Sequence, residues 1–102
     1  MILFLDRQVG DVVIPEKFSL GNLMATPAAL EALTPSDLVT AIRRHLSGDW
    51  GDVSEEDRNE NEISLKDGFR LLSVYQGANG TKFWVITEHD RSVTTILLPS
   101  DY

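Results

Sequence analysis

Apolar side chains recur every fourth position between residues 35 and 46, and this spacing predicts an amphipathic helix. A Thr-Pro pair at 34–35 supplies an N-cap and a proline at the first helical position, and Gly48 stands where the helix should end. The same Thr-Pro signal at 26–27 precedes a run of good helix formers. The sequence therefore predicts a short helix after residue 26 and a longer one after residue 34.

A third helix is predicted over residues 55–66, introduced by Ser54 with Asp57 three residues later, a capping pattern. Its only strong apolar residues are Ile63 and Leu65. We therefore expect these two side chains to anchor the helix while most of its surface is solvated.

The pattern changes from residue 69 onward, where three runs rich in β-branched and aromatic residues cover 69–75, 82–87 and 92–98. An Asn-Gly pair at 79–80 marks a hairpin between the first two runs, and Pro99 ends the last one. These features predict an antiparallel β-meander of three or more strands. Helices followed by strands indicate an α+β fold with the helices packed on one face of the sheet.

The length of 102 residues suits a single domain. Residues 20–66 are expected to be mainly helical and residues 67–102 to form the meander. Residues 1–19 form an N-terminal extension or contribute extra strands. Each of the two short apolar runs in this part, 2–5 and 11–14, has the length of a strand.

Cysteine is absent from the chain, which excludes disulfides, thiol catalysis and thiolate metal sites. Two histidines, His45 and His89, cannot form a metal site alone, and Glu88, His89 and Asp90 crowd three ligands into one turn. A turn closed by Arg91 with Glu88 or Asp90 is the simpler interpretation, so no metal or other cofactor is expected. The sequence lacks a signal-peptide pattern and a run of about 20 apolar residues, so we expect a cytoplasmic protein without membrane contact.

Charge is concentrated in one part of the chain. The net charge is −7, and the stretch 49–62 carries seven acidic residues against Arg58 alone, or −6. This acidic segment would repel a phosphate backbone and attract a basic protein surface. The simpler alternative is a solvated helix face that keeps the protein in solution. The partner-binding interpretation requires its carboxylates to be exposed and unpaired: Asp49, Asp52, Glu55, Glu56, Asp57, Glu60 and Glu62.

A ribonuclease-like enzyme is the alternative function. His45 would act as a general base with Arg70 or Arg91 stabilising an anionic transition state. The competing interpretation is that His45 and Arg44 merely cap the end of their helix. A cleft joining the histidine to the arginines would favour the enzyme, whereas a buried histidine would favour the binding protein. A homo-oligomer formed by free strand edges at 69–75 or 92–98 is a third possibility.

Trp50 lies between two glycines just after the second predicted helix. An aromatic residue in a small domain contributes much of the buried area, so we expect it in the core. Its indole N–H then needs an acceptor, and Asp49 and Asp52 are the nearest in sequence.

Four stretches, at 20–31, 44–52, 70–75 and 84–99, resemble a small family described as plasmid-related proteins, found on plasmids, phages and integrated elements. The last is the most specific and reads Trp-Val-Ile-Thr-Glu-His-Asp-Arg-Ser-Val-Thr-Thr-Ile-Leu-Leu-Pro. The resemblance spans about Leu20 to Tyr102. The setting of that family near antirestriction genes implies an accessory or anti-defence role, with a host or defence-system protein as the partner.

Overall fold

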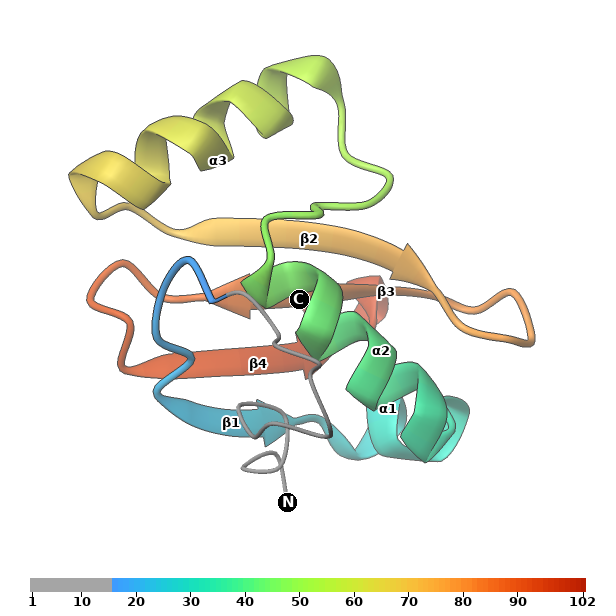
Figure 1. Cartoon of the computed structure of the whole chain (residues 1–102). Coiled ribbons are helices and arrows are strands. Elements are labelled where there is room, and N and C mark those ends of the chain that lie inside the picture. Colours follow the sequence, from blue (N-terminus) through green and yellow to red (C-terminus); the bar gives the residue numbers. More distant parts are fainter. Residues whose placement is uncertain (1–15) are drawn as a thin grey trace, which may run out of the picture.

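The computed structural model describes residues 16–102, which fold into three α-helices and a four-stranded sheet of order β1-β4-β3-β2 (Figure 1). The predicted α+β class is confirmed, and so are the three C-terminal strands. The strands are β1 (Asn22–Ala25), β2 (Leu71–Gln76), β3 (Lys82–Thr87) and β4 (Val93–Leu97). The helices are α1 (Pro27–Ala32), α2 (Pro35–Leu46) and α3 (Glu55–Asp67), with a 3-10 turn η2 (Pro99–Asp101) at the end.

The predicted caps of α1 and α2 are present. Thr26 Oγ1 accepts a hydrogen bond from the Ala29 amide at 3.1 Å. At α2, Thr34 and Asp37 form a reciprocal capping box, with both hydrogen bonds at 3.0 Å. These two helices pack on one face of the sheet and bury the main core: Ala29, Leu33, Ala41, Ile42, Leu46, Tyr75, Phe83, Val85 and Ile96.

Strand β1 was not predicted. It pairs in parallel with β4, so its partner lies about seventy residues away in sequence. Gly21 precedes it with a φ of +65°, and a Cβ there would overlap the carbonyl oxygens of Arg91 and Ser92. Glycine thus allows the chain to enter close beside β4. The strands expected at 2–5 and 11–14 lie outside the described residues.

Helix α3 lies along the outer edge of β2 rather than on a sheet face (Figure 1). Asn61 attaches it: Nδ2 donates to the Leu72 carbonyl at 2.7 Å, and Oδ1 accepts from the Leu72 amide at 3.0 Å. The prediction that Ile63 anchors this helix is wrong, because 48% of its side chain is exposed, while Asn61 and Ser64 are buried. The outward backbone N–H and C=O groups of an edge strand need hydrogen-bond partners, so the residues that attach α3 to this edge are polar.

The edge of β2 is also paired by the loop after α2. The Trp50 carbonyl accepts from the Val74 amide at 3.0 Å, and the Asp52 amide donates to the Val74 carbonyl at 2.8 Å. Gly51 lies between them with a φ of +75°, where a Cβ would overlap the Val74 carbonyl. Because β4 is an inner strand, neither edge proposed for self-association, 69–75 or 92–98, is free.

No helix within residues 16–102 is long and apolar enough to cross a bilayer.

Replacing Asn61 by alanine should destabilise the fold by about 1–2 kcal/mol, because it removes both hydrogen-bond partners of the half-buried Leu72 backbone. Urea unfolding followed by circular dichroism measures the change. Asn59→Ala is the matched control, since Asn59 is an exposed asparagine of the same helix. Equal stabilities for the two variants would contradict the anchoring role of Asn61.

Candidate functional site

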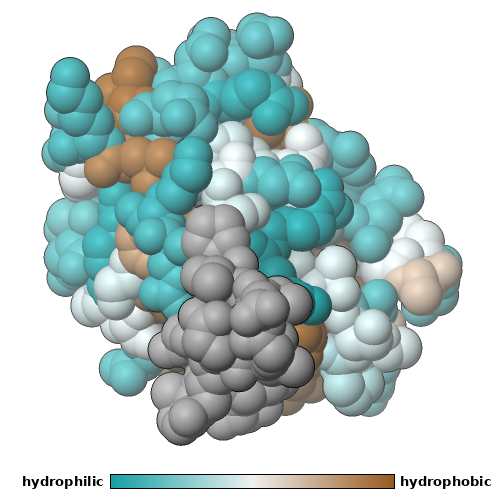
Figure 2. Space-filling model, in the orientation of Figure 1, coloured by the Kyte–Doolittle hydropathy of each residue, from teal (hydrophilic) through white to brown (hydrophobic). Residues whose placement is uncertain are grey.

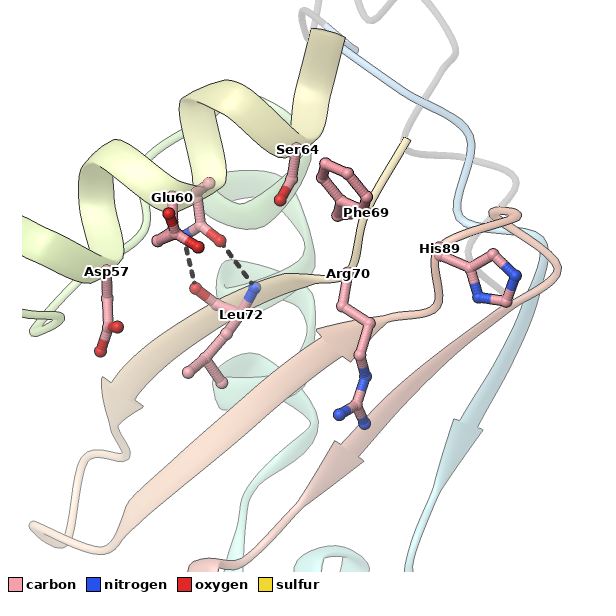
Figure 3. A pocket seen from close by; sticks show the side chains of 8 residues that line it. Asp57, Glu60, Ser64, Phe69, Arg70, Leu72 and His89 are labelled. Carbon is pink, nitrogen blue, oxygen red and sulfur yellow. Dashed lines mark hydrogen bonds between the residues drawn. The ribbon is translucent and has the colours of Figure 1, made fainter. Parts of the chain in front are cut away.

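A groove of about 490 Å³ lies between α3 and the sheet (Figure 3). Asp57, Glu60, Asn61 and Ser64 line it from α3, and Phe69, Arg70, Leu72 and His89 line the opposite side. In Figure 3 the Asp57 side chain extends from α3 toward the sheet, while Arg70 runs along the far wall. The two carboxylates thus share one concave surface with the apolar side chains of Phe69 and Leu72.

Arg70 in this groove is already engaged. Its Nε lies 3.3 Å from Glu88 Oε1, and its Nη1 donates to the Tyr102 hydroxyl at 2.9 Å. The hydrogen bond to Tyr102, helped by the charge of Glu88, holds the pKa of Arg70 above its usual value. The Arg70 guanidinium therefore does not neutralise the carboxylates of α3.

A second hollow of about 260 Å³ adjoins the groove on the same sheet face and shares Arg70 and Leu72 with it. Leu71, Trp84, Ile86 and Tyr102 complete its lining. The Trp84 and Tyr102 rings meet edge to face, with centroids 5.6 Å apart. The concave surface beside α3 thus continues into an apolar region.

Two residues of the acidic segment are engaged internally. Asp49 forms a bidentate pair with Arg44 at 2.7 and 3.1 Å, and this bond lowers the pKa of Asp49. Glu62 Oε2 accepts from the Trp50 indole N–H at 2.8 Å. The expectation that all seven carboxylates are unpaired is therefore wrong for Asp49 and Glu62.

The other five carboxylates are exposed, and none of them forms an ion pair with any residue between 16 and 102. Figure 2 shows the surface over α3 as mostly hydrophilic. The acidic face of α3 is defined here by these five residues: Asp52, Glu55, Glu56, Asp57 and Glu60.

Trp50 is buried as predicted, with 1% of its surface exposed. Its indole does not bond to Asp49 or Asp52, as expected from sequence proximity, but to Glu62. Glu62 lies twelve residues after Trp50 in the sequence, and it reaches the indole because α3 folds back over the tryptophan. The bond ties the acidic helix to the core.

His45 is fully buried in a chain of hydrogen bonds. Its Nδ1 lies 2.6 Å from Ser73 Oγ, and its Nε2 lies 2.9 Å from Thr87 Oγ1. The Thr87 hydroxyl is 2.7 Å from that of Thr94, which donates to the Leu20 carbonyl at 2.7 Å. Every buried side-chain polar atom of the described residues has a partner.

The direction of this chain fixes the imidazole tautomer. Thr94 uses its single proton on the Leu20 carbonyl, so it must accept from Thr87. Thr87 has then spent its proton and must accept from Nε2–H of His45. Nδ1 is therefore the acceptor, and the Ser73 hydroxyl donates a hydrogen bond to it. The neutral imidazole satisfies every hydrogen bond of the chain.

Burial lowers the pKa of His45 to about 3, and the nearby positive charge of Arg91 contributes to the shift. Phe18 lies against both residues, with its ring centroid 5.1 Å from the imidazole centroid and 5.9 Å from the Arg91 guanidinium carbon. Arg70 lies on the opposite sheet face, in the groove. The structure therefore brings His45 near Arg91 but not near Arg70.

Arg91 acts as a backbone clamp. Its guanidinium donates to the carbonyls of Phe69 at 2.6 Å, Ser64 at 2.8 Å and Glu88 at 3.1 Å. It thereby joins the end of α3, the start of β2 and the β3–β4 turn. The ion pair expected between Arg91 and Glu88 or Asp90 is absent among residues 16–102, since Glu88 pairs with Arg70 instead.

No group of three or more histidine, aspartate or glutamate residues in the described part of the chain is placed to hold a metal ion. Asp90, one of the candidate ligands in the β3–β4 turn, accepts hydrogen bonds from the amide and hydroxyl of Ser92.

Comparison with protein-family models, curated proteins and solved structures gives no match for this chain. The resemblance to plasmid-related proteins therefore stays a prediction. The functional interpretation depends on the geometry of the groove and the acidic face. Sequence reasoning missed the groove because Asn61, Phe69 and Leu72 carry no motif; their shared position follows only from α3 meeting the β2 edge.

Because His45 is neutral when folded and has an ordinary pKa near 6.5 when unfolded, only the unfolded state takes up its proton between about pH 6.5 and 3. The free energy of unfolding should therefore fall as the pH falls through this window. His45 contributes at most about 1.4 kcal/mol per pH unit to this fall, and above about pH 6.5 its contribution does not change with pH. His45→Gln, which keeps a donor and an acceptor, should have a shallower dependence of unfolding free energy on pH.

Chemical denaturation at pH values from 4 to 8 measures this dependence. His89→Gln is the control, because it removes an exposed histidine that lies outside the hydrogen-bonded chain of His45. A His45→Gln slope equal to that of the wild type would contradict the buried neutral imidazole.

Proposed function

We propose that this protein is a non-enzymatic binding protein, and that the acidic face of α3 with the groove beside it engages a cationic surface of a partner protein. The observation that carries the proposal is the exposure of five carboxylates that form no ion pair among residues 16–102. Asn61 and Ser64 attach the helix, and Glu55, Glu56 and Asp57 stand in its first turn, where they complement the helix dipole but have no ion-pair partner among residues 16–102.

Crowded carboxylates repel one another, and a cationic partner would relieve that repulsion. Each exposed ion pair contributes only about 0.2–1 kcal/mol. Five such charges on one helix and its preceding loop act together mainly by steering a basic surface into contact, which raises the association rate at low salt. Binding should therefore weaken as ionic strength rises.

Apolar surface in the groove would supply the rest of the affinity. Phe69 has 57% of its surface exposed, and it lines the same groove as the half-buried Leu72 and the acidic Asp57 and Glu60. Protein interfaces commonly combine an apolar centre with a polar rim. A partner loop carrying a basic side chain next to an apolar one fits this arrangement.

The biological setting is inferred from the family resemblance. On that basis the protein is an accessory protein of a mobile element, acting in the cytoplasm on a host or defence-system protein in an anti-restriction or anti-CRISPR role. Direct binding to nucleic acid is not expected, because the acidic face would repel phosphates.

The ribonuclease alternative ranks second. His45, its proposed base, has no exposed surface and gives both ring nitrogens to Ser73 and Thr87. A general base must reach the proton that it abstracts. The contacts that Arg70 and Arg91 make with the protein itself account for both arginines as structural residues.

Neutralising Glu56, Asp57 and Glu60 together, with glutamine, asparagine and glutamine, should abolish capture of the partner from an extract of the host cell. In a purified complex it should weaken binding at least tenfold at low salt and flatten the salt dependence. The measurements are affinity capture with mass spectrometry, followed by titration calorimetry at several salt concentrations.

The matched control neutralises three other exposed acids, Glu16, Glu31 and Asp67, and changes the net charge by the same amount. This variant should bind like the wild type. Equal losses in both variants would mean that only net charge matters, and unchanged binding in the first variant would refute the acidic face as the contact.

A further inference from the structure

The sheet face opposite α1 and α2 carries two adjoining hollows. Val85 packs in the core beneath those helices, so its neighbours Trp84 and Ile86 turn to the opposite face. Leu72, which lies opposite Ile86 in the ladder, turns the same way. The groove beside α3, of about 490 Å³, and the second hollow, of about 260 Å³, both have Leu72 and Arg70 in their walls. One short segment of a ligand can therefore reach both.

The groove selects a cation. Asp57 and Glu60 are three residues apart on α3, so they lie on one side of the helix, and both line the groove. Neither forms an ion pair among residues 16–102, whereas Arg70 on the opposite wall is paired with Glu88 at 3.3 Å. With His89 neutral, three carboxylates against one guanidinium leave a formal charge of −2. A lysine or arginine side chain of the partner is the matching group.

The second hollow selects an apolar side chain. Its lining is apolar apart from Arg70, whose guanidinium already donates to the Tyr102 hydroxyl. Of the two tryptophans and two tyrosines in the chain, Trp50 and Tyr75 are buried in the core. The other two, Trp84 and Tyr102, meet at this hollow, and 71% of the Tyr102 surface is exposed. Tryptophan, tyrosine and arginine are the residue types enriched where protein interfaces gain most of their binding energy.

We propose that the two hollows together bind one short segment of the partner, in which a lysine or arginine and a large apolar residue are separated by one residue. The cationic side chain contacts Asp57 and Glu60, and the apolar side chain lies against Trp84 and Tyr102. This inference rests on the proposed function and adds to it the aromatic hollow and the form of the bound segment.

The spacing follows from the sheet. In an extended segment, side chains two residues apart point the same way and lie about 7 Å apart. Neighbouring strands are about 4.8 Å apart, so a segment that crosses from β2 to β3 above Leu72 covers this distance within two residues. The long stem of a lysine or arginine then extends back to the carboxylates of α3.

Charge disfavours a nucleic acid at the same place. Exposed aromatic side chains can stack nucleic-acid bases. A phosphate backbone bound here would lie close to Asp57, Glu60 and Glu88, which would repel it. Arg70, the cation of both hollows, is already bonded to Glu88 and Tyr102. A peptide segment with a positive charge is therefore the favoured occupant.

Pentapeptides with blocked ends test both parts of the proposal. Gly-Arg-Ser-Phe-Gly carries both side chains, Gly-Gln-Ser-Phe-Gly lacks the cation, and Gly-Arg-Ser-Ser-Gly lacks the apolar group. In titrations followed by proton–nitrogen NMR, the first should bind with a dissociation constant on the order of 1 mM, and each of the others about tenfold more weakly or worse. The indole N–H signal of Trp84 should shift on binding, while that of the buried Trp50 should not.

Substitutions in the protein should remove the two preferences separately. Tyr102→Ala should erase the preference for phenylalanine over serine in the peptide and keep the preference for arginine over glutamine. Asp57→Asn combined with Glu60→Gln should do the reverse. A general loss of structure would weaken both preferences together, so this separation distinguishes contact residues from merely structural ones.

Matched controls lie outside both hollows. Met24→Ala removes an exposed apolar side chain from β1, and Glu16→Gln with Glu31→Gln removes two exposed acids. Both controls should bind all three peptides like the wild type. A wild type that binds none of the peptides, or binds all three equally, overturns the proposal. Unchanged peptide preferences in the Tyr102→Ala protein overturn it as well.

The captured partner separates this inference from the proposed function. Affinity for the partner should fall about fivefold or more in Tyr102→Ala, in addition to the loss expected when the acidic face is neutralised. If only neutralising the acidic face weakens binding, that face is the contact and the aromatic hollow is not. If neutralising the acidic face has no effect, both proposals fail.

Discussion

The hydrogen-bonded chain through His45 determines how the two halves of this protein fit together. It joins α2 to β2 through Ser73 and to β3 through Thr87, and reaches the segment before β1 through the Leu20 carbonyl. The imidazole also forms one wall of the site of Trp50, whose ring centroid is 5.7 Å away. Trp50 in turn holds α3 through its indole. The position of the groove therefore follows from a polar contact deep in the core.

Local signals predicted most of the fold, and non-local pairings account for what was missed. The caps at Thr26, Thr34 and Ser54 act over three residues, so the sequence displays them directly. Strand β1 has only four residues of ordinary propensity, and its identity as a strand comes from a parallel partner far along the chain. The anchoring of α3 at Asn61 was equally invisible, because an asparagine in a helix signals nothing about a distant strand edge.

The features of the candidate site also divide into those that the local sequence predicted and those that depend on tertiary structure. Charge density located the acidic face, since it is a property of adjacent residues. The partners of Asp49 and Glu62 depended on the loop geometry around Trp50. For His45, type and position indicated possible acid–base chemistry, but burial decides its role, and burial depends on the packing of the whole sheet. Physical context, rather than residue type, separates a structural histidine from a reactive one.

The attachment of α3 has an evolutionary consequence. A helix docked by an apolar stripe must conserve several positions of that stripe, whereas α3 contributes two buried polar residues, Asn61 and Ser64. Apart from Glu62, which accepts from the Trp50 indole, the remaining surface positions can diversify at little cost to folding. Related sequences can thus differ in the outward residues of this one helix while the scaffold beneath it stays the same.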